Sequence, residues 1–133
     1  MRILIVEDEP IIAIDLEEIV LSHLEEAEVL TTGSIAAALS SLEKSIDFAL
    51  LDVSLGAKGE TSLPIARRLL RERVPFCFVS SSLSELPPIF AGVPKLAKPF
   101  RPEQVAEMLE LASAGPAVSA GCPSTPGLRV RSC

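Results

Sequence analysis

Five short apolar runs alternate along the chain with segments of helical period, and this alternation constrains the possible fold most strongly. The third and fourth runs are apolar enough to be buried on both faces, as strands inside a parallel sheet are. Parallel neighbours need crossover connections, which the helical segments between the runs provide. The pattern predicts an α/β fold with a doubly wound, five-stranded parallel sheet, (βα)5, in the order 2-1-3-4-5. The expected strands are residues 2–6, 27–32, 46–51, 75–79 and 93–97.

Four crossover or terminal helices are expected from period and capping signals. Ser34 is a typical N-cap for the second helix, and Pro64 is placed in the first turn of the third. The fourth crossover, residues 80–92, contains Pro87-Pro88, which interrupts a helix, so its helix should be short or irregular. The last helix follows Pro102. The apolar residues expected on the inner helix faces are Ile12, Leu16, Ile19 and Val20; Ile35, Ala38, Leu39 and Leu42; Ile65, Leu69 and Leu70; and Val105, Met108, Leu109 and Ala112.

The length of 133 residues suits a single core, which we assign to residues 1–113. Residues 114–133 are rich in Ala, Gly, Ser and Pro and have no apolar period, so we expect a disordered tail. Three cysteines without CxxC spacing fit free thiols in a reducing compartment. With no signal-peptide pattern and no apolar run of membrane-spanning length, we expect a cytoplasmic protein without a membrane partner.

The charge of the expected domain excludes one large class of partner. Residues 1–113 hold all 18 acidic residues but only 10 of the 12 basic ones, for a net charge of −8. A nucleic-acid surface needs a basic face that displaces counterions from phosphates. We therefore expect no nucleic-acid partner.

Polar residues follow the apolar runs at the points where the strands should end. In a doubly wound sheet, ligand sites form outside the carboxyl ends of the strands. Glu7, Asp8 and Glu9 follow the first strand, Asp52 the third, Ser80 the fourth and Lys98 the fifth. Two unit charges about 4 Å apart repel by roughly 4 kcal/mol at an effective dielectric near 20, so clustered carboxylates need a cation. Carboxylate and carbonyl oxygens suit Mg²⁺, which becomes the expected cofactor.

These residue types fit phosphoryl transfer to a carboxylate. Asp52 is the expected nucleophile, because carboxylates form acyl phosphates in covalent catalysis. The transferred group spreads its charge over three oxygens and needs fixed cations and donors. Mg²⁺, the Lys98 ammonium and the Ser80 hydroxyl are the expected contacts.

Four motifs occur in the order and spacing of a known family. Together they resemble the receiver domain of two-component response regulators, over residues 2–113. GETSLPIA (59–66), PFCFVSS and the Leu-Pro before FAGVPKLAKPF resemble an atypical stand-alone subclass, whose fourth strand ends in a Phe-Ala-Thr-Gly-Tyr type motif. The four motifs are ILIVEDEP, ALLDVSLG, PFCFVSS and KLAKPF.

The resemblance implies a flavodoxin-like fold and a function. Asp52 would accept a phosphoryl group from a histidine kinase or a histidine phosphotransfer protein, and the phosphorylated domain would bind a downstream protein target. Asp8, Asp52 and the Ser54 carbonyl would ligate Mg²⁺ directly, with Glu7 acting mostly through water. Ser80 and Lys98 would take the places of the switch Ser/Thr and of the invariant Lys, and the Lys98-Pro99 bond is often cis in the family. The protein would be a phosphoacceptor rather than an enzyme, although it would take part in its own phosphotransfer and dephosphorylation.

Two departures keep a second function open. Lys95 stands where family members usually carry Tyr or Phe, and SSSLS replaces the Thr-Gly-Tyr portion of the subclass motif. A receiver-like module that binds its partner without phosphorylation is therefore the alternative. A helix-capping role for Glu7, Asp8 and Glu9 is a further interpretation of the acidic run.

Overall fold

The computed structural model describes residues 1–55, 59–81, 83 and 86–114. Five parallel strands form one sheet in the order β2-β1-β3-β6-β7, which confirms the predicted topology. Among the described residues, no helix has the length and apolar character needed to span a membrane. The strands are β1 (Arg2–Val6), β2 (Glu28–Thr32), β3 (Phe48–Leu51), β6 (Phe76–Ser80) and β7 (Lys95–Ala97).

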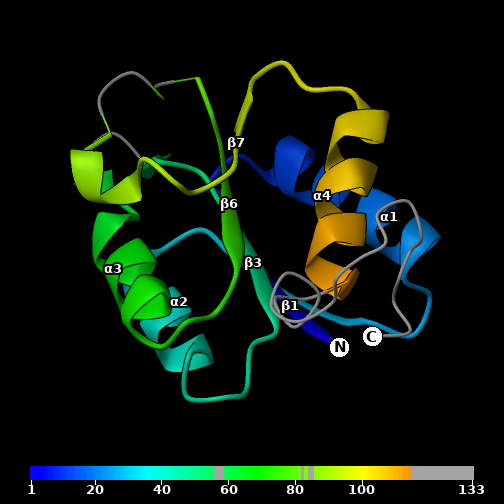
Figure 1. Cartoon of the computed structure of the whole chain (residues 1–133), viewed down its shortest axis with the longest axis horizontal. Helices are drawn as coiled ribbons and strands as arrows, with labels where there is room; N and C mark the ends of the chain where they lie inside the picture. The colour runs from blue at the N-terminus through cyan, green and yellow to red at the C-terminus, as the bar shows by residue number, and fades with distance from the viewer. Residues whose placement is uncertain (56–58, 82, 84–85, 115–133) are drawn as a thin grey trace, which may run out of the picture.

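Helices cover both faces of this sheet, as Figure 1 shows. α1 and α4 lie on one face, and α2 and α3 lie on the other. The fourth crossover contains the short 3-10 helix η2 (Pro88–Phe90), as the proline pair predicts. The α-helices are α1 (Pro10–His23), α2 (Ile35–Ser41), α3 (Leu63–Arg71) and α4 (Pro102–Ala114).

Alternate residues of each strand pack into two separate hydrophobic cores, one on each face of the sheet, because successive side chains of a strand point to opposite faces. All four residues of β3 are buried, as expected for an interior strand of a parallel sheet. The core under α1 and α4 includes Ile3, Ile5, Phe48, Leu50, Cys77 and Val79. The core under α2 and α3 includes Leu4, Val6, Ala49, Leu51, Phe76 and Phe78.

The helix faces follow the predicted stripes closely. The Ser34 hydroxyl accepts a hydrogen bond from the Ala37 amide at 3.1 Å, which confirms the N-cap of α2. On α1 the structure buries Ala13, whereas Ile12 is only half-buried. The side chain of Ala112, assigned to the core by its period, lies outside the described residues, as does the segment 115–133.

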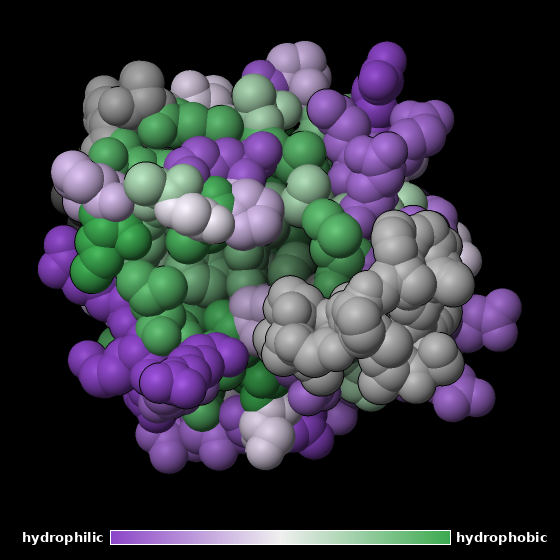
Figure 2. Space-filling model, viewed as in Figure 1, coloured by the Kyte–Doolittle hydropathy of each residue, from purple (hydrophilic) through white to green (hydrophobic). Residues whose placement is uncertain are grey.

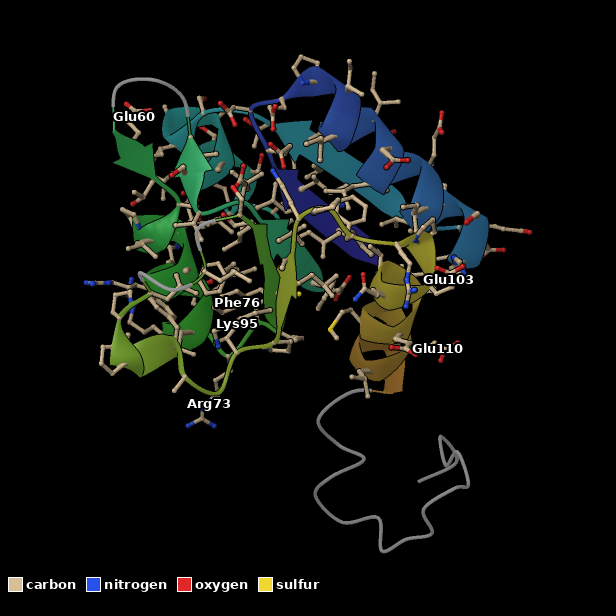
Figure 3. All side chains as sticks on the ribbon, turned by 90° about the horizontal axis from the view of Figure 1, so that it is seen from above. Glu60, Arg73, Phe76, Lys95, Glu103 and Glu110 are labelled. Carbon is tan, nitrogen blue, oxygen red and sulfur yellow. The ribbon has the colours of Figure 1, made fainter. Side chains whose placement is uncertain are left out.

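Three phenylalanines pack together where the fourth crossover returns to the sheet. Phe90 of η2 is fully buried and meets Phe76 and Phe78 of β6 edge to face, with ring centroids 6.4 and 5.3 Å apart. This contact anchors η2, at the end of the fourth crossover, against β6. Hydrophobic side chains gather over the region between α3 and β6 on the face shown in Figure 2. Charged side chains such as Arg73, Glu103 and Glu110 lie at the outside of the molecule, as Figure 3 shows.

One element has no counterpart among the sequence predictions. Between β3 and α3, β4 (Ser54–Leu55) and β5 (Glu60–Thr61) form a two-stranded antiparallel sheet. Strands of two residues are too short to produce a recognisable apolar alternation. The hairpin starts two residues after Asp52 and therefore borders the carboxyl end of β3.

Candidate functional site

Glu7, Asp52 and Lys98 each lie directly after the last residue of a strand, and backbone hydrogen bonds hold them there. The amide of Glu7 donates to the carbonyl of Thr32 at 2.9 Å, and the amide of Asp52 donates to the carbonyl of Val6 at 2.9 Å. Each residue thus continues the sheet ladder by one step. Their side chains are the first free to turn toward the edge of the sheet, so the strand ends set the geometry of the site.

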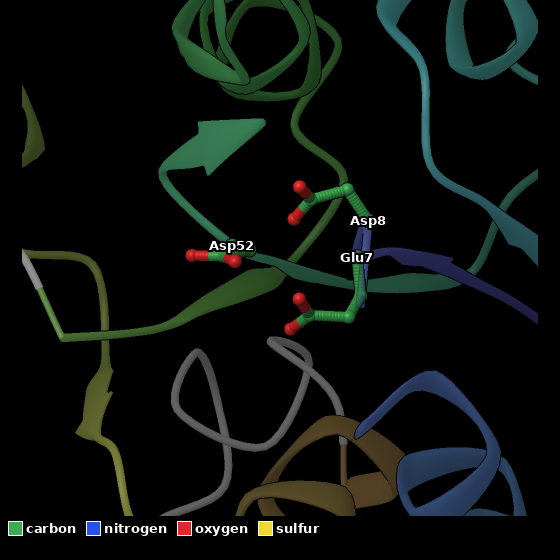
Figure 4. Close-up of side chains that lie close together, drawn as sticks. All are labelled: Glu7, Asp8 and Asp52. Atoms are coloured by element: carbon green, nitrogen blue, oxygen red, sulfur yellow. The ribbon is translucent and has the colours of Figure 1, made fainter. Parts of the chain in front are cut away.

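Glu7, Asp8 and Asp52 form an acidic cluster, as the sequence predicts. One carboxylate oxygen from each residue lies within 4.8 Å of the others. Figure 4 shows the three carboxylates gathered beside the ends of β1 and β3. Glu7 and Asp52 are buried, with 3% and 7% exposure, whereas Asp8 is exposed. The cluster therefore has a closed side and a side open to solvent.

Lys98 is the cation that the structure brings to this cluster. Its Nζ lies 2.8 Å from Glu7 Oε1 and donates a hydrogen bond to Asp52 Oδ2 at 3.1 Å. The backbone amide of Lys98 donates to the carbonyl of Ser80 at 3.1 Å, which extends the pairing of β7 with β6. The Lys98-Pro99 peptide bond is cis, as the family resemblance implies. An ammonium shared by two buried carboxylates makes this corner of the site a charged network.

The network changes the proton affinities of its members. The pKa of Glu7 is raised from its ordinary 4.5 to about 7, mainly by burial; the hydrogen bond from Lys98 opposes this shift, and the neighbouring charge of Asp52 adds to it. Burial by itself lowers the pKa of Lys98, but the hydrogen bonds and charges of Glu7 and Asp52 outweigh it and hold that pKa above its ordinary value. Near neutral pH, Lys98 is therefore charged while Glu7 is only partly ionised.

Glu9, which the sequence places among the polar residues at the strand ends without a catalytic or metal-binding role, belongs to this network. Its amide donates to Glu7 Oε2 at 3.2 Å, and its Oε1 lies 3.7 Å from Lys98 Nζ. Glu9 is also the N-cap residue of α1, but its side chain makes no capping hydrogen bond. Capping of α1 by this side chain is therefore not found. The signal in the sequence was the run of three consecutive acids, which runs past the strand end into the loop.

The two serines of the predicted site lie at different depths. Ser80 is the last residue of β6 and is 1% exposed. Ser54 is exposed at the start of β4, where it pairs with Thr61 of β5. We predict that the Ser80 hydroxyl contacts a phosphoryl group and that the Ser54 carbonyl contacts a metal.

The donor set of the cluster fits a hard divalent cation. Three carboxylates face one ammonium, so the fully ionised site carries an excess of negative charge. Glu7 Oε1 is buried and, within the described part of the chain, accepts no well-formed hydrogen bond, although Lys98 Nζ lies near it. Oxygen donors without thiolate or imidazole suit Mg²⁺ better than zinc. Glu7, Asp8 and Asp52 are the residues that would hold it.

Comparison of the structure with solved structures finds several that share its fold. SdrG from Sphingomonas melonis Fr1 is 40% identical with a TM-score of 0.72, and the match covers 85% of this chain and 96% of SdrG. The receiver (REC) domain of the PhyR response regulator from Erythrobacter litoralis is 22% identical with a TM-score of 0.68, over 93% of this chain and 95% of that domain. The anti-anti-sigma factor PhyR from Bartonella quintana is 25% identical with a TM-score of 0.64, over 84% of this chain and 46% of that protein.

No protein-family model and no curated protein matches the sequence. The structural matches and the sequence motifs agree nevertheless. The sheet order, the acidic cluster at the ends of β1 and β3, and 40% identity to SdrG over most of both chains point to one family. This chain belongs to the receiver domains of response regulators.

Proposed function

We propose that this chain is a cytoplasmic, single-domain response regulator that accepts a phosphoryl group on Asp52 from a histidine kinase or a histidine phosphotransfer protein. Mg²⁺ is the proposed cofactor, and a downstream protein is the proposed target. The observation that carries the proposal is the position of Asp52. It lies within 4.8 Å of two further carboxylates and accepts a hydrogen bond from Lys98 at 3.1 Å.

Asp52 is suited to act as the nucleophile of this transfer. One of its carboxylate oxygens forms a bond to phosphorus while the bond from phosphorus to the donor histidine nitrogen breaks, and the electron pair of that bond returns to the imidazole. The product is an acyl phosphate on Asp52. Burial keeps the carboxylate against the sheet, so it is oriented before the donor arrives.

The other site residues would stabilise charge on the transferred group. Lys98 is held in place by Glu7 and Asp52, and its ammonium would contact a phosphoryl oxygen. Ser80, buried at the end of β6, would donate its hydroxyl to another. Asp8, Asp52 and the Ser54 carbonyl would hold the metal directly, with Glu7 acting mostly through water. Bound Mg²⁺ would offset the charge of the carboxylates and of the incoming phosphoryl oxygens.

An apolar surface beside the site suits a helical phosphodonor. Ile11 and Ile14 of α1 are 82% and 57% exposed, and residues three apart on a helix share a face. They lie in the first turns of α1, directly after Glu9. A histidine-bearing helix that packed there would bring its phosphohistidine close to Asp52.

One observation favours the alternative of an interaction module that works without phosphorylation. Lys95 Nζ donates hydrogen bonds to the carbonyls of Phe90, Ala91 and Val93 at 2.9, 3.3 and 2.7 Å. The side chain that would be aromatic in most relatives here ties η2 to β7 instead. A segment held in this way can present a binding surface without a switch at residue 95.

Beryllofluoride, an acyl-phosphate mimic, separates the two functions. We expect Mg²⁺-dependent binding, observed as shifts of amide resonances around Asp52 and Lys98, in the wild type and in an Asp15→Asn control, whose side chain is exposed on α1. Asp52→Asn should remain folded and show no binding. A screen against histidine kinases should give labelled wild-type protein and unlabelled Asp52→Asn. Absence of binding and of transfer in the wild type would leave the interaction module as the function.

A further inference from the structure

The segment Thr32-Gly33, which joins β2 to α2, packs directly against the backbone of the acidic dipeptide Glu7-Asp8. The carbonyl of Thr32 accepts a hydrogen bond from the amide of Glu7 at 2.9 Å. A Cβ atom on Gly33 would lie 3.1 Å from Asp8 Cα and 3.3 Å from the Glu7 carbonyl oxygen. Both of these neighbours are backbone atoms, which cannot move aside as the end of a flexible side chain can.

The requirement for glycine at residue 33 comes from this approach and not from backbone conformation. The φ angle of Gly33 lies outside the left-handed region, whereas Gly59 has a φ of 77°. An alanine at residue 33 would therefore be allowed by its own backbone. It would instead push the Glu7-Asp8 backbone away by a few tenths of an ångström.

Asp8 is the member of the acidic cluster most exposed to such a displacement. Glu7 is held by the Thr32 carbonyl and the Lys98 ammonium, and Asp52 is held by the sheet and by Lys98. Asp8 lies in the loop between β1 and α1, where its Cα is the atom nearest to the position of a Gly33 Cβ. Packing against residue 33 is thus one of the contacts that determine where its carboxylate lies.

We propose that Gly33 is a positioning residue of the metal site: the absence of its side chain lets the β2–α2 segment hold Asp8 at the distance that the carboxylate cluster requires. This inference rests on the proposed Mg²⁺ function. Mg²⁺ demands near-ideal octahedral geometry, and ligand distances in good sites hold to about 0.2 Å. A backbone shift of a few tenths of an ångström therefore exceeds what the site tolerates.

Metal titration of glycine variants tests this role. The affinities of the folded protein for Mg²⁺ and Mn²⁺ are measured by calorimetry, well below the unfolding midpoint, for wild type, Gly33→Ala and Gly33→Val. Gly92→Ala is the matched control, because its Cβ would meet nothing within 4 Å and its φ is also outside the left-handed region. We expect about tenfold weaker binding for Gly33→Ala, a larger loss for Gly33→Val, and wild-type affinity for Gly92→Ala.

The thermal midpoint of each metal-free variant, measured in parallel, separates positioning from stability. A purely structural role would lower the midpoint of Gly33→Ala and leave the metal affinity of the folded protein unchanged. That result would overturn the positioning role and leave the proposed metal site standing. A wild-type protein that binds neither ion would overturn the metal site itself, and this inference with it. Gly33→Ala is the milder change. If Gly33→Val does not fold, the metal affinity of Gly33→Ala alone decides the test.

Discussion

The Lys98 ammonium and the Glu7 carboxylate form a buried ion pair, with 2.8 Å between Nζ and Oε1 and with side chains that are 13% and 1% exposed. The two residues are far apart in the sequence. They follow strands that are not neighbours in the sheet, since β3 and β6 lie between β1 and β7. Asp52 of the intervening segment contacts the same ammonium. This network couples the stability of the metal-free protein to the chemistry of its site.

Removal of the ammonium should destabilise the metal-free protein. Lys98→Ala leaves two buried carboxylates without their cation, and we expect a loss of about 3–5 kcal/mol in the free energy of unfolding at pH 8, part of which Mg²⁺ restores. Urea unfolding with and without Mg²⁺ measures both effects. Lys44→Ala, at an exposed position just after α2, is the control. We also expect Lys98→Ala to bind Mg²⁺ but to lose the response to phosphorylation, so a variant that no longer binds the ion would contradict the separation of these roles.

Stability of the metal-free protein should fall as the pH rises from about 4.5 to about 7. Burial raises the pKa of Glu7 to about 7, so the folded state binds this proton more tightly than the unfolded state does. The stabilising contribution of the Glu7 proton is fully present below pH 4.5 and is lost above pH 7. This contribution of Glu7 amounts to at most about 3.5 kcal/mol, because a tenfold change in proton affinity is worth about 1.4 kcal/mol. Glu7→Gln should flatten the pH profile of the urea midpoint in this window, and an unchanged profile would assign the effect to another group.

Lys95 should stabilise the end of the fourth crossover. Its ammonium contacts three carbonyls between Phe90 and Val93, and charged hydrogen bonds of this kind contribute about 1.5–3 kcal/mol each before exposure weakens them. We expect Lys95→Met to cost about 2 kcal/mol and to speed amide hydrogen exchange at residues 90–93. Exchange elsewhere in the sheet should change less. Protection that is equal in wild type and variant would show that the aromatic packing of Phe90 alone holds this segment.

The exposed isoleucines of α1 should matter for transfer from a protein donor and not for the chemistry. Ile11→Ser combined with Ile14→Ser should slow phosphotransfer from a histidine kinase about tenfold, because a few residues at the centre of an interface contribute most of its binding energy. Phosphorylation by a small acyl phosphate, which needs no docking surface, should be unchanged. Leu111→Ser, at a 64% exposed position on α4, is the matched control. If phosphorylation by the kinase and by the small acyl phosphate slowed equally, the substitutions would have changed the phosphorylation site itself and not a docking surface.

Much of the fold could be predicted because its signals are local. A run such as FALL predicts an interior strand, and β3 is buried throughout. Ser34 has the side chain of an N-cap and acts as one. The break at Pro87-Pro88 follows from the missing amide and the fixed φ of proline, and the short 3-10 helix η2 starts at Pro88.

Other features could not be predicted because they depend on distances across the fold. The hairpin of β4 and β5 has too few residues to show a period. Lys95 is an ordinary lysine in the sequence, and only the return of η2 to β7 brings three carbonyls to its ammonium. Ala13 and Ile12 both fit the apolar stripe of α1, and the packing of the helix on the sheet decided which is buried.

The sequence by itself determined that acids follow the first and third strands and that a lysine follows the fifth, because the apolar period sets where each strand ends. The rule that parallel strands end at one edge then predicted their meeting. Only the tertiary structure decided how they meet: Glu7 and Asp52 are buried, Asp8 is exposed, and one ammonium is shared between the two buried acids. Burial and shared partners are properties of the packed molecule, and they set the charge on Glu7 and the distance of Gly33 from Asp8.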